Sequence, residues 1–362
     1  MAMLRILLAL MLACCGGLAL QARAAPSPPQ QEPQVQAAMA VPEELQQAVA
    51  ALGIDRAGVP ELDRVRRLFE FMVAEDGLGL HYQEFPTYDI PGSYARRRVN
   101  CLSFTMMFIA LARSVGVDAY AQASDDALAI RVVDDTVFRA RHVKAGVDID
   151  GAQYTVDVGW RSVVAERRPR RIPDAQLVAL LHNNNAVERL QHADHAAATA
   201  EIATALALEP DSATIWNNAG VIHSRFGRRD AAEQAYLHAL ELDRDHIGAL
   251  GNLVGLYRAM GEAGLAHRYD RRLQHAQASD PFSQFLIAQD LMRLGAYDVA
   301  VPHYRRAIRL LPNQPEFHRS LAEAYTRLGN DWAARRALRQ AQSLEQRKLS
   351  QRGLTDAGSG PG

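Results

Sequence analysis

The feature that most constrains the fold is a 34-residue period in the second half of the chain. Four glycines keep this spacing, namely Gly227, Gly261, Gly295 and Gly329. Two series of alanines keep it too, one through Ala198, Ala232, Ala266, Ala300 and Ala334 and one through Ala205, Ala239, Ala307 and Ala341. A fixed period of this length predicts stacked helical hairpins, in which glycine turns the chain and small residues let the two helices approach closely.

The best-formed repeat carries a signature sequence. It contains Trp216, Gly220, Ala232, Tyr236 and Ala239, and in these residues it resembles the tetratricopeptide repeat (TPR). The resemblance implies an all-α TPR superhelical solenoid with repeats at 179–212, 213–246, 247–280, 281–314 and 315–348. The first repeat is degenerate. The third has Asp270 and Leu273 where its neighbours have a bulky apolar residue and an alanine.

The shape of such an array suggests what it binds. The concave face of stacked hairpins accepts an extended peptide or a partner helix, so we expect a protein or peptide partner there. The alternative is that the repeats only stiffen or cover the neighbouring domain. The histidines scattered along this half do not have the spacing of a metal site.

The first residues have the features of an export signal. Arg5 precedes an apolar stretch, and Ala22-Arg23-Ala24 fits a cleavage site, so residues 1–24 are predicted to be a signal peptide of a periplasmic or secreted protein. The alternative is a lipoprotein held at the membrane through Cys14. The apolar stretch is too short to predict a membrane span. The segments 25–41 and 349–362 are predicted to be a disordered spacer and a disordered tail.

Once this leader is removed, a single cysteine remains, Cys101. It follows Asn100, a good helix cap, and opens an apolar run that predicts a buried central helix. A thiol in the first turn of a helix is favoured as the thiolate and lies near backbone amides that can stabilise an oxyanion. The alternative is a small buried hydrophobic side chain at the start of a helix.

Strand-like segments follow this helix, and the last two carry possible partners for the thiol. These segments are 117–123, 127–133, 142–149 and 153–158. Asp150-Gly151 is a strong hairpin-turn signal. A two-residue loop makes His142 and Asp157 diagonal neighbours with Lys144 opposite Asp157, whereas a four-residue loop sets His142 opposite Asp157. In either register His142 and Asp157 share a face of the sheet, as a Cys–His–Asp triad requires.

Together these motifs resemble the bacterial transglutaminase-like superfamily. The matching segments are 100–104, 112–116, 141–143 and 154–158. The resemblance implies an α+β, papain-like domain over residues 42–165, with Cys101 as nucleophile, His142 as general base and acid, and Asp157 as the acid that orients it. It also implies acyl transfer through a thioester with water as acceptor. The chain lacks the Gly-Gln-Cys-Trp sequence of the animal enzymes, which argues against glutamine–lysine crosslinking.

Other residues near Cys101 complete the candidate site. A second oxyanion donor is expected from Gln83, Tyr82 or Asn100. The basic run 96–98 is expected to be a solvated loop, with stabilisation of a thiolate or an acidic substrate as the alternative, and the run 167–171 belongs to a predicted linker at 166–178. A formal net charge of −1 and the lack of aromatic residues within these runs argue against a nucleic-acid partner. With one remaining cysteine and no HExxH motif, no metal or other cofactor is expected.

The sequence thus supports two hypotheses. The first is an exported transglutaminase-like cysteine hydrolase, a peptidase or amidase, with a TPR platform over residues 179–348 that binds its protein substrate. The alternative is a non-enzymatic TPR scaffold that carries an inactive transglutaminase-like binding module.

Overall fold

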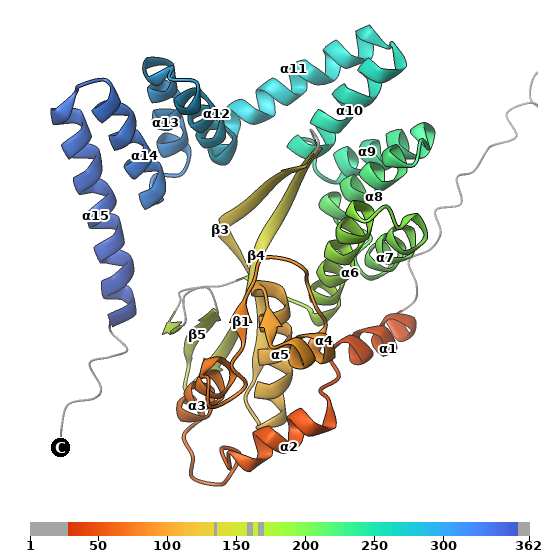
Figure 1. Cartoon of the computed structure of the whole chain (residues 1–362), viewed down its shortest axis with the longest axis vertical. Coiled ribbons are helices and arrows are strands. Elements are labelled where there is room, and N and C mark those ends of the chain that lie inside the picture. Colours follow the sequence, from red (N-terminus) through yellow and green to blue (C-terminus); the bar gives the residue numbers. More distant parts are fainter. Residues whose placement is uncertain (1–27, 134–135, 158–161, 166–169, 354–362) are drawn as a thin grey trace, which may run out of the picture.

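The computed structural model describes residues 28–133, 136–157, 162–165 and 170–353. It contains an N-terminal mixed α/β region with a small antiparallel sheet, followed by an all-α array of helical hairpins (Figure 1). The predicted signal peptide at 1–24 and the anchor at Cys14 lie outside the described residues. Within those residues, no helix combines the length and the apolar character that crossing a membrane requires.

Five helices belong to the α/β region: α1 (Pro28–Ala38), α2 (Glu43–Ala51), α3 (Glu61–Val73), α4 (Ile90–Arg96) and α5 (Cys101–Ser114). Helix α1 falls in the segment 25–41, which the sequence predicts to be a spacer. The helix contacts α6 of the array, and Val35, Ala38 and Met39 pack against the main apolar core. Packing of these side chains against the core stabilises the helix, although a segment rich in proline and glutamine has little tendency to form one by itself.

The sheet has the strand order β6-β5-β4-β3-β7, with every neighbouring pair antiparallel. Its strands are β3 (Ala119–Val133), β4 (Thr136–Ile149), β5 (Ala152–Asp157), β6 (Ser162–Ala165) and β7 (Arg170–Ile172). The first two predicted strands are one long strand, β3, whose pairing with β4 shifts register between Ser124 and Leu128. Beyond this shift β3 and β4 form a ribbon that extends from the sheet toward the array (Figure 1), and β4 contacts α8 and α10.

Helix α5 is the buried central helix that the apolar run predicts. Phe104, Met106, Met107 and Phe108 have no exposed surface. They share one apolar core with the residues on one face of the sheet, namely Ala119, Ala121, Val143, Ala145, Val147 and Val156. The start of α5 is therefore fixed by core packing as well as by its cap.

The array consists of five helical hairpins, as the period predicts. They are α6 (Asp174–Gln191) with α7 (His195–Leu208), α8 (Ala213–Arg225) with α9 (Arg229–Leu242), α10 (Ile247–Met260) with α11 (Ala263–Ser279), α12 (Pro281–Arg293) with α13 (Tyr297–Leu310), and α14 (Pro315–Arg327) with α15 (Asp331–Gly353). The four spaced glycines all have φ between +72° and +80°, the left-handed conformation that closes these turns.

The edges of the array differ from the sequence-based boundaries. Strand β7 and the first turn of α6 lie within the predicted linker 166–178, and α15 continues into the predicted tail as far as Gly353. Leu177 and Val178 of α6 are fully buried in the core of the α/β region. The first hairpin therefore joins that region directly, which also explains why its repeat signature is degenerate.

The array divides between α11 and α12. Among the described residues, the apolar core of α12–α15, which we call the rear block, includes no side chain from α6–α11. In α11, Asp270 occupies the position where other repeats have a bulky apolar residue, and it accepts hydrogen bonds from Arg258 and Gln274. A carboxylate there removes the apolar contact that would otherwise join consecutive hairpins.

Candidate functional site

Helix α5 begins at Cys101, and Asn100 caps it as predicted. The Asn100 Oδ1 accepts a hydrogen bond from the Ser103 amide (3.0 Å), and the Ser103 Oγ accepts one from the Asn100 amide (2.9 Å). This reciprocal capping box satisfies two of the amides that a helix start leaves unpaired. Cys101 itself is partly exposed. The thiol therefore lies at an accessible helix N-terminus rather than inside the core.

The side chain of Asn100 also connects this helix start to the array. Its Nδ2 donates to Thr87 Oγ1 (2.7 Å), and the same Thr87 oxygen accepts from Nδ2 of Asn184 on α6 (3.2 Å). Asn100 and Thr87 are buried. Since the amide of Asn100 is occupied by these bonds, Asn100 is a poor candidate for the oxyanion donor.

Gln83 lies beside the helix start. The short strands β1 (His81–Tyr82) and β2 (Arg98–Val99) run parallel, and the Gln83 amide donates to the Val99 carbonyl (2.8 Å). Arg98 Nη1 donates to Gln83 Oε1 (2.9 Å), which fixes the amide group, while the Nε2 bond to Pro86 O is long at 3.4 Å. Tyr82 is 54% exposed. Of the two predicted side-chain amide donors, Gln83 has the N–H group with the longer hydrogen bond, since Nδ2 of Asn100 donates to Thr87 at 2.7 Å.

The arginines of the run 96–98 have contacts within the fold. Arg96 lies over the ring of Tyr88 (4.7 Å to the centroid), and Arg97, with φ +54°, ends α4 and donates to the Leu78 carbonyl. The bond from Arg98 to Gln83 is a third such contact. The three arginines therefore help to hold the chain segment before Cys101 in its conformation.

The hairpin between β4 and β5 has the two-residue loop. Ile149 pairs with Ala152, and Asp150 and Gly151 both have positive φ, as a type I′ turn requires. This register makes His142 and Asp157 diagonal neighbours on one face of the sheet. The side chains of His142 and Asp157 lie outside what the structure describes, so the distances that would define a triad are not among the described contacts.

The backbone shows where β4 meets α5. Thr105, one turn after Cys101, donates through Oγ1 to the carbonyl of Val143 (3.3 Å), the residue next to His142. Helix α5 packs on the face of β4 that carries Val143, Ala145 and Val147.

The face of the sheet opposite α5 is polar. The Tyr120 hydroxyl donates to Asp148 Oδ1 (2.9 Å), and Arg171 pairs with Asp148 and stacks on the Tyr120 ring at 3.6 Å. Burial, followed by the bond to Asp148, raises the pKa of Tyr120 to about 12. A Cβ at Gly146 would come within 2.5 Å of this ring, so glycine is required there.

A row of asparagine amides joins the first helices of three hairpins. Asn218 donates to Asn183 (2.8 Å), Asn217 donates to Asn218 (3.2 Å), and Asn252 donates to Asn217 (2.9 Å). Asn183, Asn217 and Asn218 are buried. We call this row the amide ladder. Neither the amide ladder nor the hydrogen bond from Asn184 to Thr87 was predicted from the sequence. The run of three asparagines at 183–185, in a repeat whose matching positions are usually apolar, indicates polar contacts there.

Comparison with known families assigns the array. A profile described as "Tetratricopeptide repeat" matches residues 213–246, and one described as "TPR repeat" matches residues 288–329. About residues 174–347 form a TPR array. TPR arrays bind proteins and peptides, and this is the function class that the comparison supports. Neither profile extends into the α/β region.

Several solved structures resemble part of the chain at low sequence identity. A MamA structure (MSR-1) is 18% identical, covers 47% of this chain and 98% of its own, and has a TM-score of 0.26. MamA from Desulfovibrio magneticus RS-1 is 16% identical, with 46% and 95% covered and a TM-score of 0.27. YrrB, described as a TPR protein with an unusual peptide-binding site, is 19% identical, with 46% and 86% covered and a TM-score of 0.26. No curated protein matches the sequence.

Proposed function

We propose that the protein is an exported cysteine hydrolase, a peptidase or amidase, whose TPR array binds the protein substrate. The observation that carries this proposal is the position of Cys101. It is the first residue of a capped central helix, it is partly exposed, and Thr105, one turn further along that helix, bonds to the carbonyl of Val143, the residue next to His142 in the sequence. The transglutaminase-like resemblance of residues 60–160 is consistent with this position.

The proposed reaction proceeds in two steps. The Cys101 thiolate attacks the substrate carbonyl, His142 gives its proton to the departing amine, and a thioester forms. A water molecule then attacks the thioester and gives one proton to His142, and the carboxylic acid leaves as the Cys101 thiolate and the protonated His142 are restored. Asp157 would orient the imidazole from the neighbouring strand.

The oxyanion of each tetrahedral intermediate needs two donors. The backbone amide of Cys101 is one, because the first amides of a helix have no partner within it. Gln83 Nε2 is the other, because Arg98 holds the oxygen end of that amide and leaves its N–H group with only a long contact. Removing one such donor typically slows the reaction about 100-fold to 1,000-fold.

Export is part of the proposal. It rests on the apolar leader with its Ala22-Arg23-Ala24 cleavage site, and anchoring through Cys14 is the alternative form of the same export.

Alkylation of Cys101 tests the proposed chemistry. We expect iodoacetamide to react with the wild-type protein well below pH 8.5, and we expect His142→Ala and Asp157→Asn to slow that reaction. His81→Ala is the control, because His81 is exposed on β1 and contacts Glu75 at 3.9 Å. A wild-type rate that follows an ordinary thiol and is unchanged by His142→Ala would reject the triad.

That outcome would favour the second candidate, a TPR scaffold whose α/β region is a binding module. The TPR profiles that match residues 213–246 and 288–329 support a binding role of this kind. Comparing exported proteins that are cleaved by wild-type protein and by Cys101→Ala then decides between hydrolysis and binding. A scaffold gives the same cleavage pattern with both.

A further inference from the structure

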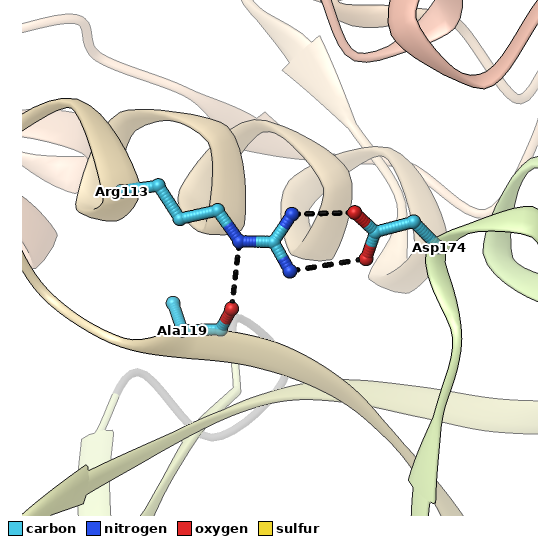
Figure 2. Close-up of polar contacts among 3 residues, drawn as sticks. All are labelled: Arg113, Ala119 and Asp174. Carbon is cyan, nitrogen blue, oxygen red and sulfur yellow. Dashed lines mark hydrogen bonds and ion pairs between the residues drawn. The ribbon is translucent and has the colours of Figure 1, made fainter. Parts of the chain in front are cut away.

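The first array helix lies along the helix that begins at Cys101 and is bonded to both ends of it. Near the end of α5, Arg113 reaches across to Asp174 at the start of α6 through both guanidinium ends, and its Nε donates to the Ala119 carbonyl at 2.8 Å (Figure 2). At the start of α5, Asn184 bonds to Thr87, which bonds to Asn100. Ten residues of helix span about 15 Å, so α6 is fixed at two separated points.

The N-terminal point is built around one buried hydroxyl oxygen. Thr87 Oγ1 has two lone pairs, and both are used, because Asn100 and Asn184 donate to the same atom. These bonds set the orientation of the Asn100 amide, whose other end must face the Ser103 amide to cap α5. If the bond from Asn184 is lost, the Thr87 hydroxyl can rotate and Asn100 gains freedom to turn away from its capping position.

We infer that Asn184 is a positioning residue for Cys101, supplied by the TPR array. It does not touch the thiol. It acts through Thr87 and Asn100 on the first turn of α5, where the thiolate and the first oxyanion amide are formed. This inference rests on the proposed function for its catalytic consequence, but the effect on the thiol can be measured separately.

The neighbouring residue joins the same helix to the next hairpin of the array. Asn183 accepts a hydrogen bond from Asn218, the next member of the amide ladder, so adjacent residues of α6 join the ladder and the Cys101 helix.

The test compares the pH dependence of Cys101 alkylation in four variants. Asn184→Ala and Thr87→Val remove the link, Thr87→Ser retains its oxygen, and Gln176→Ala is the matched control, since this amide on α6 bonds to Glu209 within the array. We expect the first two to lower the alkylation rate at pH 7 by about threefold to tenfold, which is the scale of one buried hydrogen bond. Thr87→Ser and Gln176→Ala should keep the wild-type profile.

The outcomes separate this inference from the proposed function. If Asn184→Ala keeps the wild-type profile while His142→Ala slows alkylation, the positioning role is wrong and the triad stands. If Asn184→Ala shifts the profile while His142→Ala has no effect, the link is real and the triad fails. If Gln176→Ala lowers the rate as much as Asn184→Ala, the effect is general loosening of α6, and the inference is overturned. Thermal unfolding of each variant shows whether it remains folded at the assay temperature.

Discussion

The two ends of the TPR array relate differently to the rest of the molecule. The first hairpin shares one apolar core with the α/β region, and its helix α6 is bonded to α5 at both ends. The rear block has an apolar core of its own. It touches the α/β region through contacts between α15 and β6.

This difference shows that repeats with one period can do separate tasks. A repeat that replaces its apolar signature with Asn183 and Asn184 can pack against, and bond to, a neighbouring domain. A repeat that places Asp270 in the signature divides the array into two cores. The departures from the repeat pattern therefore identify the places where the array does more than stack.

The largest expected loss of stability comes from removing one large buried side chain from each of the two apolar cores. Phe108→Ala in α5 removes a side chain with no exposed surface, and Phe317→Ala in α14 removes one that packs against Phe282 and Phe285. Each change should lower the free energy of unfolding of its own region by about 3–5 kcal/mol. Hydrogen exchange measured peptide by peptide should then show faster exchange in α5 and α6 for the first variant and in α12–α15 for the second.

The same experiment tests whether the α/β region and the rear block unfold separately. If Phe317→Ala speeds exchange in α5 as much as in α14, the two regions unfold as one unit and the division at α11–α12 has no energetic meaning. Substitutions at exposed positions of the same helices, Ser114→Ala and Arg327→Lys, provide the baseline.

A smaller effect is expected from the turns. Gly261 and Gly329 have φ of +80° and +72°, and a Cβ at either position would meet no atom within 4 Å. A valine at either position would meet no steric clash, but it would have to adopt the left-handed conformation that L-residues disfavour. Gly261→Val and Gly329→Val should therefore each lower the free energy of unfolding by about 1–2 kcal/mol. Melting curves should show the loss, with exchange increased around α10–α11 for the first and α14–α15 for the second. An unchanged melting transition in both would contradict the role assigned to these glycines.

The smallest effect is confined to alkaline pH. Burial, more than the neighbouring Asp148, raises the pKa of Tyr120 to about 12, from the value of 10.0 for an exposed tyrosine. The protonated form is favoured by folding, so its contribution is complete below pH 10 and is lost as the pH rises from 10 to 12. Urea unfolding midpoints should therefore fall across this interval, and Tyr120→Phe should reduce the fall. Tyr304→Phe is the matched variant in the rear block, where burial also raises the pKa to about 12.

The array could be predicted from the sequence because its information is local and repeated. The glycine turns, the prolines that follow α7 and α13, and the cap at Asn100 each act within a few residues. The Asp150-Gly151 turn likewise fixed the hairpin register. The order in residues 28–38 and in β7 depends instead on distant partners, since α1 packs on α6, and Arg171 of β7 pairs with Asp148.

In the candidate site, too, the features set by neighbouring residues could be predicted, and those set by distant residues could not. Cys101 at a helix start follows from Asn100 and the apolar run behind it. The bond between Asn184 and Thr87 joins residues 97 positions apart, and no local pattern encodes it. The face of β4 that packs on α5 could have been inferred from the alternation of Val143, Ala145 and Val147.

The sharing of α6 has a consequence for how this protein can be divided. Cleavage near residue 173 would remove Leu177 and Ala179 from the core they complete and expose apolar surface on the α/β region. Exchange of this region between genes would have to carry α6 with it. The structural border of the α/β region therefore lies inside the repeats.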